Sequence, residues 1–370
     1  MSDRCRSAFR PTVGLKPDLQ HYLPSTILEL VGSLNIPRSS GTPRVGAVIV
    51  NWNSFDHLRR CLAALAAQET HFARIVVIDN DSIDAPENLD FASGPETLSY
   101  LRLPYNAGFA RGNNLALREL ADCEWVALIN PDAFLDRSWL LRMIEASIHH
   151  PGFSCFASCL VSANQPSILD GMGDAYHVSG LVWRHGHGRP LREISAVEVF
   201  SPCAAAAIYR REALLAVGGF DEDFFCYVED VDLGFRLRLA GHRCLLVPAA
   251  IAHHIGSATT GGKHSDFAIY HGHRNLVWAY VKNMPGLLFW ALLPLHLAMN
   301  LASLVWFAYR GQGRVILRAK RDAIKGLAKM WRKRREIQAR RSVSIREIWR
   351  IIDKRFWKSP PEIVQAQRLP

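Results

Sequence analysis

The sequence lacks several features that would place it in a well-defined class at once. Its first residues, "MSDRCRSAFRPTVGLKPD", contain no apolar run, so we expect no secretory signal. Only two of its eight cysteines lie near each other, at a spacing of four residues. This spacing argues against a disulfide framework and against a zinc site, so we expect reduced thiols in a cytosolic protein.

The two common phosphate-binding glycine motifs are also absent. The first predicted strand continues into "NWNSFDHL", which has none of the glycines of a G-x-G-x-x-G turn. The chain contains no P-loop motif either. A nicotinamide-dependent enzyme and an ATP-hydrolysing enzyme are therefore disfavoured.

Acidic residues are scarce only at the C-terminal end. Residues 310–370 hold 19 Lys or Arg against 5 Asp or Glu, whereas the first 309 residues hold 25 basic and 29 acidic residues. The formal net charge of +10 therefore belongs to the tail, and the rest of the chain is slightly acidic.

The chain itself reads as an extension followed by a repeating pattern. Residues 1–43 are rich in Pro, Ser and Arg and are interpreted as an N-terminal extension. From residue 44, four strand-like runs ("RVGAVIVNWN", "ARIVVIDNDS", "LSYLRLPYN", "EWVALINPD") alternate with three helix-like runs ("FDHLRRCLAALAAQ", "GFARGNNLALREL", "SWLLRMIEASIHH"). This alternation predicts an α/β domain over residues 44–282, with a mostly parallel sheet covered by helices.

Polar side chains follow each of the four predicted strands. They are Asn51 and Asn53, then Asp79, then Asn106, and finally Asn130 and Asp132. Each alone is explained by a turn or a helix cap, which Asn and Asp favour. Ligands bind outside the carboxyl ends of the strands in such sheets, so the four positions together favour a ligand site.

Six ordered motifs resemble the family 2 glycosyltransferases of the GT-A fold, especially the rhamnosyltransferase-like members. The motifs are "VGAVIVNWNSFDHLRRCLAAL", "VVIDNDS", "LPYNAGFARGNN", "WVALINPDAFLD", "RREALLAVGGFDEDFFCYVEDVDLGFRLRLAGHRC" and "AHHIGSATTG". The resemblance covers about residues 44–285. It implies a GT-A fold and inverting transfer of a sugar from a nucleotide-diphosphate sugar.

The resemblance also assigns residues that would hold the donor. It places Asp79 against the base, with Asn51 and Asn53 in the same nucleotide pocket. A second set would approach the ribose and the diphosphate: Asn106, Gly108, Arg111 and Asn113. A surface ion pair is the alternative for Arg111.

A divalent cation is expected beside the diphosphate. Asp132 in "NPD" takes the place of the family's metal-binding D-x-D carboxylate, while Asn130 replaces the first acid with a poorer ligand. The resemblance makes His254 the late metal ligand, with His253 as the alternative. Mg²⁺ or Mn²⁺ is the expected cofactor, because both accept carboxylate oxygens with some imidazole.

The segment "YVEDVDLGFRLRLAGH" carries three carboxylates within four positions. The resemblance places the catalytic base on Asp230, with Glu229 second. Asp232 precedes Arg236 by four residues, which predicts an ion pair along a helix. Crowded carboxylates raise one another's proton affinity, which suits a base that works near neutral pH.

A Gly- and His-rich stretch, "DGMGDAYHVSGLVWRHGHGRP", lies where acceptor-side loops are expected. His185 and His187 are two residues apart with no cysteine nearby, so we interpret them as loop residues and not as metal ligands.

Residues 283–309 contain no charged residue and are long enough for a helix across ~30 Å of hydrocarbon. His296, Asn300 and Ser303 form a mildly polar stripe, and Pro294 predicts a kink. A single span would place the basic tail on the far side of the membrane, against the positive-inside tendency. We expect a re-entrant or in-plane membrane helix first, an ordinary span second and a buried core helix third.

The tail, residues 310–370, is predicted to contain an amphipathic basic helix. Five apolar residues fall near one helical face: Ile316, Ala323, Ile324, Leu327 and Trp331. Such a pattern is typical of a helix on an anionic membrane surface. Nucleic-acid binding is the weaker alternative, because no zinc-finger or RRM motif is present.

These observations predict a metal-dependent, inverting glycosyltransferase at the cytoplasmic face of the inner (plasma) membrane. Its donor would be a dTDP- or UDP-sugar, with rhamnose as the candidate sugar. Its acceptor would be lipid-linked or a polysaccharide in cell-envelope glycan synthesis, and we expect no nucleic-acid partner. The alternatives are a catalytically silent membrane adaptor with a GT-A fold and a nucleic-acid-binding protein acting through the basic tail.

Overall fold

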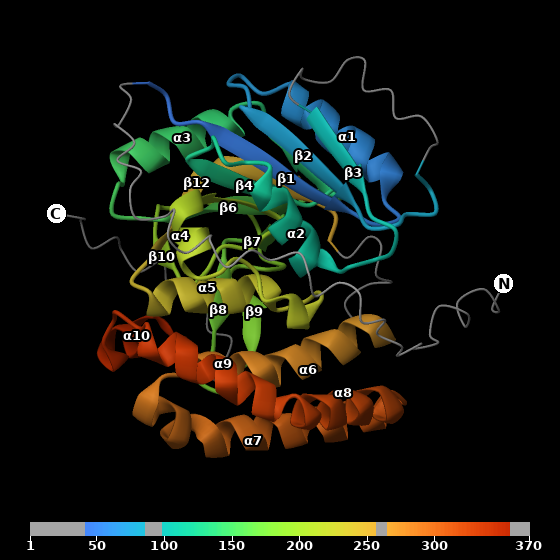
Figure 1. The fold of residues 1–370 in the computed structure, drawn as a ribbon, viewed down its shortest axis with the longest axis vertical. Coiled ribbons are helices and arrows are strands. Elements are labelled where there is room, and N and C mark those ends of the chain that lie inside the picture. The colour runs from blue at the N-terminus through green and yellow to red at the C-terminus, as the bar shows by residue number, and fades with distance from the viewer. Residues whose placement is uncertain (1–40, 86–97, 257–264, 356–370) are drawn as a thin grey trace, which may run out of the picture. The chain divides into compact units, whose positions relative to one another are not determined.

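The computed structural model describes residues 41–85, 98–256 and 265–355. One compact unit begins at Pro43, and the extension before it lies outside the described residues. The first half of this unit alternates strands and helices as predicted (Figure 1). Its elements are β1 (Val45–Asn51), α1 (Phe55–Ala66), β2 (Arg74–Asp79), β3 (Leu98–Arg102), α2 (Phe109–Arg118) and β4 (Trp125–Ile129).

The main sheet runs in the order β10-β12-β6-β11-β4-β1-β2-β3. Strands β3, β2, β1 and β4 are mutually parallel, as predicted. Strand β11 then lies antiparallel between β4 and β6, while β12 runs parallel to β6. The added elements are β5 (Ala133–Leu135), α3 (Trp139–His149), β6 (Cys155–Ser162), β10 (Glu198–Val199), β11 (Ala206–Arg210), α4 (Arg211–Ala216) and β12 (Cys244–His254).

Both faces of this sheet are covered, which explains why β1 is an unbroken apolar run. All seven residues of β1 are buried. Ala47 and Ile49 pack in one core with residues of α1 and α3, whereas Val48 and Val50 pack in a second core with α2. Figure 1 shows α1 and α3 on one side of the sheet and α2, α4 and α5 (Glu229–Leu239) on the other.

A small second sheet pairs two strands from the Gly- and His-rich stretch. Strand β8 (Asp174–Tyr176) is antiparallel to β9 (Val182–Arg184), so that Asp174 lies opposite Arg184. The short strand β7 (Leu169–Gly171) joins the main sheet through β6. His185 and His187 follow β9 in a turn, as expected for loop residues.

The C-terminal part adds a layer of helices beside α5 (Figure 1). Helix α6 packs against α5, α8 and α9, and α7 packs against α8. The helices are α6 (Asp266–Asn283), α7 (Gly286–Tyr309), α8 (Gly313–Lys325), α9 (Leu327–Ala339) and α10 (Ile345–Ile351). Whether residues 283–309 and 310–370 act as segments separate from residues 44–282 stays a prediction.

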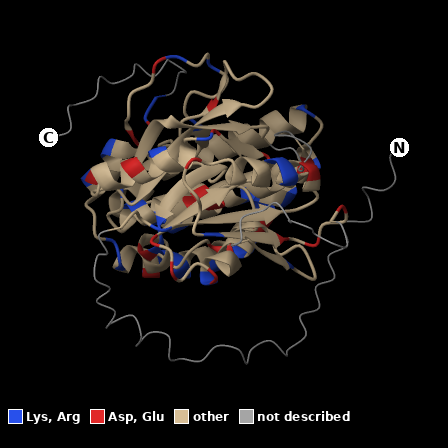
Figure 2. Ribbon diagram, turned by 90° about the horizontal axis from the view of Figure 1, so that it is seen from above, with Lys and Arg blue, Asp and Glu red and all other residues tan. Residues whose placement is uncertain are grey.

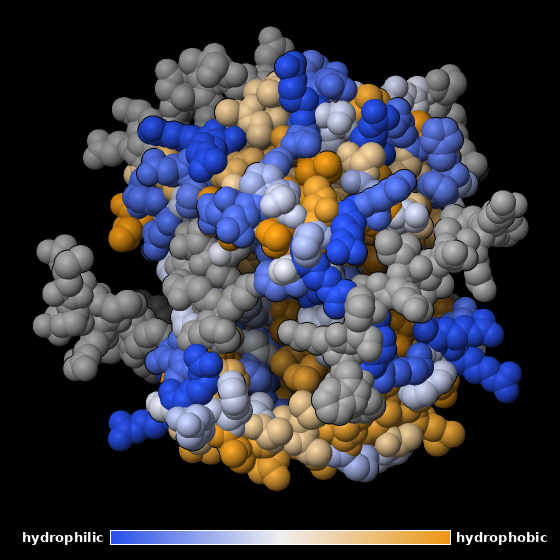
Figure 3. Space-filling model, turned by 180° about the vertical axis from the view of Figure 1, so that it is seen from behind, coloured by the Kyte–Doolittle hydropathy of each residue, from blue (hydrophilic) through white to orange (hydrophobic). Residues whose placement is uncertain are grey.

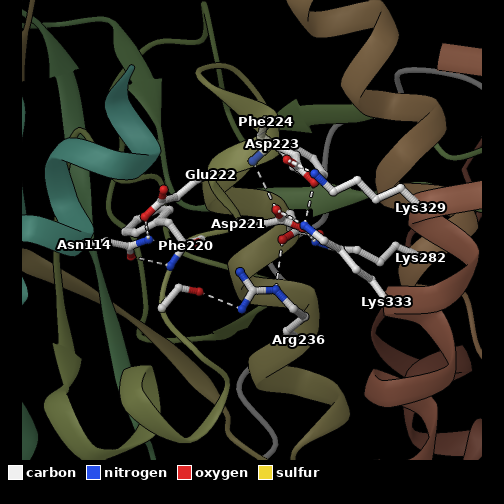
Figure 4. Close-up of polar contacts among 12 residues, drawn as sticks. Asn114, Phe220, Asp221, Glu222, Asp223, Phe224, Arg236, Lys282, Lys329 and Lys333 are labelled. Atoms are coloured by element: carbon white, nitrogen blue, oxygen red, sulfur yellow. Dashed lines mark hydrogen bonds and ion pairs between the residues drawn. The ribbon is translucent and has the colours of Figure 1, made fainter. Parts of the chain in front are cut away.

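The basic tail is held to the rest of the unit by buried and half-buried ion pairs (Figure 4). Lys282 Nζ of α6 lies 2.5 Å from Asp221 Oδ2, and Lys329 Nζ of α9 lies 2.6 Å from Asp223 Oδ1. Lys333, one turn further along α9, contacts both carboxylates. Part of the tail's positive charge is therefore neutralised within the protein.

The predicted ion pair within α5 is present and is part of a larger network. Asp232 is fully buried, and its Oδ2 accepts a hydrogen bond from Arg236 Nε at 2.9 Å. Its Oδ1 lies 2.7 Å from Lys282 Nζ and accepts from Asn283 Nδ2 at 2.7 Å. Asp232 therefore connects α5 to α6, which supports the structural role expected for it.

The apolar helical face predicted for the tail is partly covered by the protein itself. A single basic helix was expected, but the chain forms two, α8 and α9, that meet at Gly326. Ile316 and Ala323 are buried against the protein's own helices, while Ile324 is exposed. Seen from above, acidic and basic positions are interspersed and do not form two separate fields (Figure 2).

Helix α7 has one face on the protein and the other exposed. Among its residues only Phe289, His296 and Phe307 are buried. Several large apolar side chains are more than half exposed: Leu287, Trp290, Leu297, Leu301, Val305, Trp306 and Tyr309. Figure 3 shows hydrophobic side chains gathered along the lower edge, where Figure 1 places α7. A buried core helix, the third alternative above, is therefore not what the described residues form.

Candidate active site

A cavity of about 830 Å³ opens at the carboxyl ends of the parallel strands. Segments that follow β1, β2, β3 and β4 all contribute to its wall, together with the start of α5 and the end of β12. The volume is within the ~300–1,000 Å³ range of sites for small molecules and cofactors. The strand ends thus meet at one cavity, and ligand binding there stays a prediction.

Asp132 and His254 face each other in this cavity. Strand β5 pairs with β12 so that Ala133 lies opposite His254. This pairing brings Asp132, the residue before Ala133, close to the imidazole of His254. Asp132 Oδ1 is 3.4 Å from His254 Nε2, and both side chains are almost completely buried. The Gly256 backbone N–H donates to Asp132 Oδ2 at 3.1 Å and fixes the carboxylate.

The other imidazole nitrogen is held by a carboxylate that the sequence did not single out. Asp170 Oδ2 in β7 lies 2.7 Å from His254 Nδ1, and Arg184 contacts the same oxygen. Burial lowers the pKa of His254, but Asp132 and Asp170 outweigh burial and raise that pKa above its ordinary value. Burial raises the pKa of Asp132, yet His254 holds it below its ordinary value.

This arrangement fits a divalent cation. Without a metal, the raised pKa of His254 favours a proton on Nε2 that faces the Asp132 carboxylate. A divalent cation can take the place of this proton, because neutral His254, with Nδ1–H donating to Asp170, presents the lone pair of Nε2 to the same carboxylate. Two buried atoms here have no hydrogen-bond partner among the described residues, His254 Nε2 and Asn130 Oδ1. Carboxylate oxygen, imidazole nitrogen and amide oxygen are ligands that Mg²⁺ or Mn²⁺ accepts.

The alternative metal ligand, His253, points elsewhere. Its Nε2 lies 2.9 Å from Asp136 Oδ1, and it is not part of the cavity wall. Successive strand residues face opposite sides, so only one of the two histidines can face Asp132. The geometry therefore favours His254 over His253 as the ligand.

The two candidate bases lie at the first turn of α5. Asp230 is half-buried in the cavity wall, and its Oδ2 accepts a hydrogen bond from the Ala204 backbone N–H at 3.2 Å. Glu229 is buried, and its Oε2 has no hydrogen-bond partner among the described residues. Burial raises the pKa of Asp230, and burial with the charge of Asp230 raises the pKa of Glu229 well above its ordinary value.

A third carboxylate, not predicted from the sequence, lies beside Asp230. The carboxylate oxygens of Asp174 and Asp230 and the Cys203 sulfur lie within 4.8 Å of one another. Burial and the charge of Asp230 raise the pKa of Asp174 well above its ordinary value. The "WRHG" motif contributes Arg184, whose positive charge opposes this effect for both Asp174 and Asp230.

The loop that leads into α5 has an unusual backbone. Phe225, Tyr227 and Val228 all have positive φ angles, 66°, 65° and 69°, which are costly for side chains of this size. Asn275 of α6 is fully buried and donates from Nδ2 to the carbonyl oxygens of Phe224, Cys226 and Tyr227 at 2.7–2.9 Å. One buried amide thus holds the strained loop that positions Glu229 and Asp230.

Comparisons with known proteins agree with this geometry. The Glycosyl transferase family 2 model matches residues 47–218. The N-acetylglucosaminyl-diphospho-decaprenol L-rhamnosyltransferase of Mycobacterium tuberculosis is 27% identical over 249 residues, covering 60% of this chain and 80% of the relative. Rhamnosyltransferase WbbL of Escherichia coli K12 is 27% identical over 223 residues, covering 56% and 81%.

Residues 47–218 are a family 2 glycosyltransferase domain. A crystal structure of GalNAc-T7 with UDP, GalNAc and Mn²⁺ shares the fold, with a TM-score of 0.53, 15% sequence identity and coverage of 66% of this chain and 48% of that chain. The predicted GT-A fold and the resemblance to rhamnosyltransferases are thus confirmed. Transfer of a sugar in glycan synthesis is the activity that the family and these relatives support.

Within the glycosyltransferase domain, two of the seven predicted donor residues line the cavity. Asn106 Oδ1 accepts from the Gly108 backbone N–H at 2.9 Å and shapes the turn that begins α2. Gly108 has φ +85°, and a Cβ there would lie 2.6 Å from a Phe225 ring carbon. Asn80, which follows β2 and lines the cavity too, hydrogen-bonds to the Gly108 carbonyl at 3.3 Å.

Three further donor predictions fall in a buried network outside the cavity wall. Asn51 and Asp79 are paired in register on β1 and β2, and Asn51 Nδ2 donates to Asp79 Oδ1 at 3.0 Å. Ser82 donates to the same carboxylate, and the Asn53 backbone N–H donates to Ser82 Oγ at 2.9 Å. In this conformation the three residues fix the turns after β1 and β2, and direct contact with a base stays a prediction.

Two donor predictions, Arg111 and Asn113, have other contacts in this conformation and stay predictions. Arg111 is half-exposed on α2, and its Nη1 lies 4.0 Å from Glu222 Oε2, so the surface ion pair is the arrangement found. Asn113 is buried and donates to the Phe109 carbonyl one turn earlier at 2.9 Å. Neither residue is part of the cavity wall.

His185 and His187 of the Gly- and His-rich stretch line the cavity. His187 Nδ1 lies 2.8 Å from the Asp170 carbonyl oxygen, and its side chain is 46% exposed. Burial lowers the pKa of His185, which favours the neutral imidazole. Their place in the wall is consistent with the acceptor-side position expected for this stretch, and neither faces the pair formed by Asp132 and His254.

Proposed function

We propose that the protein is an inverting, divalent-metal-dependent glycosyltransferase. It moves a sugar, with dTDP-rhamnose as the first donor to test, onto a lipid-linked or polysaccharide acceptor in cell-envelope glycan synthesis. One observation carries this proposal: the facing pair of Asp132 and His254 shares a cavity with the carboxylates of Glu229 and Asp230.

The reaction needs the charge of the departing diphosphate neutralised and the acceptor hydroxyl deprotonated, and each of these two groups of residues serves one of these needs. Asp132 and His254 would hold Mg²⁺ or Mn²⁺, with the Asn130 amide oxygen as a further ligand. When bound, the ion neutralises the charge that develops on the departing diphosphate. Two loops border the space for the donor: the loop after β2 contributes Asn80, and the loop after β3 contributes Asn106 and Gly108.

Asp230 is proposed as the general base. Its raised pKa brings its proton affinity closer to neutral pH, where a base is most effective. The Ala204 N–H orients its carboxylate, so the acceptor hydroxyl would lose its proton to Oδ1 or Oδ2 as it attacks the sugar from the face opposite the diphosphate. One direct displacement of this kind inverts the configuration at the sugar carbon.

The membrane provides the acceptor in this proposal. Helix α7 is long and apolar enough to cross a membrane, judged by length and composition alone. It lies along the helical layer instead of projecting from it (Figure 1), and its outer face is apolar. We therefore place α7 in the plane of the cytoplasmic leaflet. The diphospho-decaprenol in the mycobacterial relative's name supports a lipid-linked acceptor.

Binding and transfer measured on the full-length protein in detergent test the proposal. Calorimetry with dTDP-rhamnose and a panel of UDP-sugars, in Mn²⁺, Mg²⁺ or EDTA, should find one donor whose binding needs the ion. His254→Gln should weaken that binding more than about tenfold. The adjacent His253→Gln is the matched control and should leave it within about twofold. If no nucleotide sugar binds under any condition, the silent adaptor becomes the better description.

A further inference from the structure

A second cavity lies between α7 and the basic helices α8 and α9. Its volume is about 960 Å³, and its wall is largely aliphatic and aromatic. Leu293, Leu297, Leu301 and Leu304 of α7 form one side, while Leu327 and others of α8 and α9 form the opposite side. It shares no lining residue with the catalytic cavity. We call this cavity the α7–α9 groove.

The polar residues of the groove are mostly cationic. Lys320, Arg332 and Arg335 line it, and none of its lining residues in the described part of the chain is Asp or Glu. Among the described residues, Lys320 Nζ hydrogen-bonds to two neutral oxygens, Asn300 Oδ1 at 2.5 Å and the His273 carbonyl at 3.2 Å, and burial lowers its pKa to about 8. Three basic residues beside apolar walls complement a molecule with an anionic head and a hydrocarbon chain.

The cations of helix α9 differ in their surroundings, and Arg334 is buried and donates to the Val281 and Met284 carbonyls. Lys329 and Lys333 are paired with Asp221 and Asp223, as described above. Arg332 and Arg335, from the same two turns, are exposed and form no ion pair with the part of the chain that the structure describes. Their guanidinium groups are therefore available to bind an anion at the groove, and Arg is well suited to phosphate.

We propose that the α7–α9 groove binds one hydrocarbon chain of an anionic membrane phospholipid, with the lipid phosphate at Arg332 and Arg335. The groove continues the exposed apolar face of α7, because Leu297 and Leu301 belong to both. Its separation from the catalytic cavity favours a bilayer lipid over the lipid-linked acceptor, whose sugar must reach Asp230. Lipid binding here would fix the orientation of the catalytic cavity relative to the membrane.

Photo-cross-linking tests the proposal on the full-length protein. The probe is phosphatidylglycerol with a diazirine in its acyl chain, diluted in phosphatidylcholine vesicles, and the cross-linked residues are mapped by mass spectrometry. We expect cross-links at groove residues such as Leu327 and Trp331. The double variant Arg332→Gln/Arg335→Gln should lower their yield about 30-fold, from ~1 kcal/mol for each cation near an anionic surface.

Two matched variants separate the groove from general surface charge. Arg340→Gln/Arg346→Gln removes two exposed charges outside the groove and should leave the yield within about twofold. Ala328→Trp fills the groove from an exposed position and should abolish its cross-links, whereas Ala339→Trp, outside the groove, should not.

The proposal rests on the placement of α7 in the membrane and not on sugar transfer. The cross-linking is therefore carried out with neither sugar donor nor acceptor present, and its outcome is independent of enzymatic activity. Vesicle sedimentation reports membrane binding separately. Cross-links confined to Leu287, Trp290 and Tyr309 on the outer face of α7 would overturn the proposal, and so would equal yields from both double variants. Displacement of phosphatidylglycerol by an equal amount of polyprenyl diphosphate would assign the groove to the acceptor instead.

Discussion

Replacing Asp230 by Asn should remove the base while leaving the donor site intact. An amide of nearly the same shape can still accept from the Ala204 N–H but cannot take a proton from an acceptor hydroxyl. General-base catalysis contributes about 10²- to 10⁴-fold. We therefore expect kcat to fall by about that factor, while metal-dependent donor binding changes by less than about twofold.

The same substitution should not destabilise the protein. The pKa of Asp230 is raised in the folded state, chiefly by burial, so the folded protein binds its proton more tightly than the unfolded chain. Stability linked to this group is present at low pH and is lost as the pH rises from the unfolded pKa through the folded pKa. Asn has no charge to bury, so the variant should unfold at an equal or higher temperature at pH 7.

Glu229→Gln is the matched comparison, because the two carboxylates are adjacent and both pKa values are raised. Initial rates with saturating donor, thermal unfolding and calorimetry should be measured on both variants. Loss of turnover in Glu229→Gln with activity retained in Asp230→Asn would exchange the two roles. Full activity in both variants would refute the assignment of a base to this helix turn.

Three further substitutions test the parts that support the site. Asp170→Asn removes the charge behind His254 and should weaken metal binding about tenfold, whereas Asp136→Asn behind His253 should not, as measured by Mn²⁺ titration. Gly108→Ala places a Cβ against Phe225 at a positive φ and should cost about 1–3 kcal/mol in urea unfolding, while Gly152→Ala, with open space around it, should cost less than that. Lys282 and Lys333 outweigh burial and lower the pKa of Asp221, so its stabilising effect is present above the unfolded pKa of ~3.9 and is lost as the pH falls below it. Asp221→Asn should therefore be less stable than the native chain at pH 7, and this deficit should only begin to shrink at pH 3, because the pKa of Asp221 in the folded protein lies well below its ordinary value. A deficit that grows as the pH falls would contradict this.

The parallel half of the sheet could be predicted because each strand there is short, apolar and followed by a helix of clear period. The direction of β11 could not, since a buried strand has the same pattern whether it runs parallel or antiparallel. Asp132 and His254, which the structure brings face to face, were both singled out from the sequence, but Asp170 was missed. Strand β7 is only three residues long, and its contact with His254 depends on the register of β6 between them.

The contacts among the predicted donor residues could not be foreseen from the sequence. Asn51 and Asp79 stand at strand ends, as residues of a ligand site do, yet their register makes them each other's hydrogen-bond partners. Asn275 was missed. It lies within α6, far along the chain from the loop it holds, and a buried Asn inside a helix gives no local signal of the three carbonyls it will meet.

The basic tail shows most clearly what an amphipathic pattern leaves open. Apolar residues on one helical face predict that the face is covered, but a membrane and a neighbouring helix cover it equally well. In this protein Ile316 and Ala323 are buried in α8, which packs against α6. Two lysines of α9 form ion pairs with Asp221 and Asp223. What remains for a membrane is the outer face of α7 and two arginines at the groove. A count of charge and hydrophobicity over the tail therefore overstates its membrane affinity, and truncating it should unfold the layer against α6 as well as weaken vesicle binding.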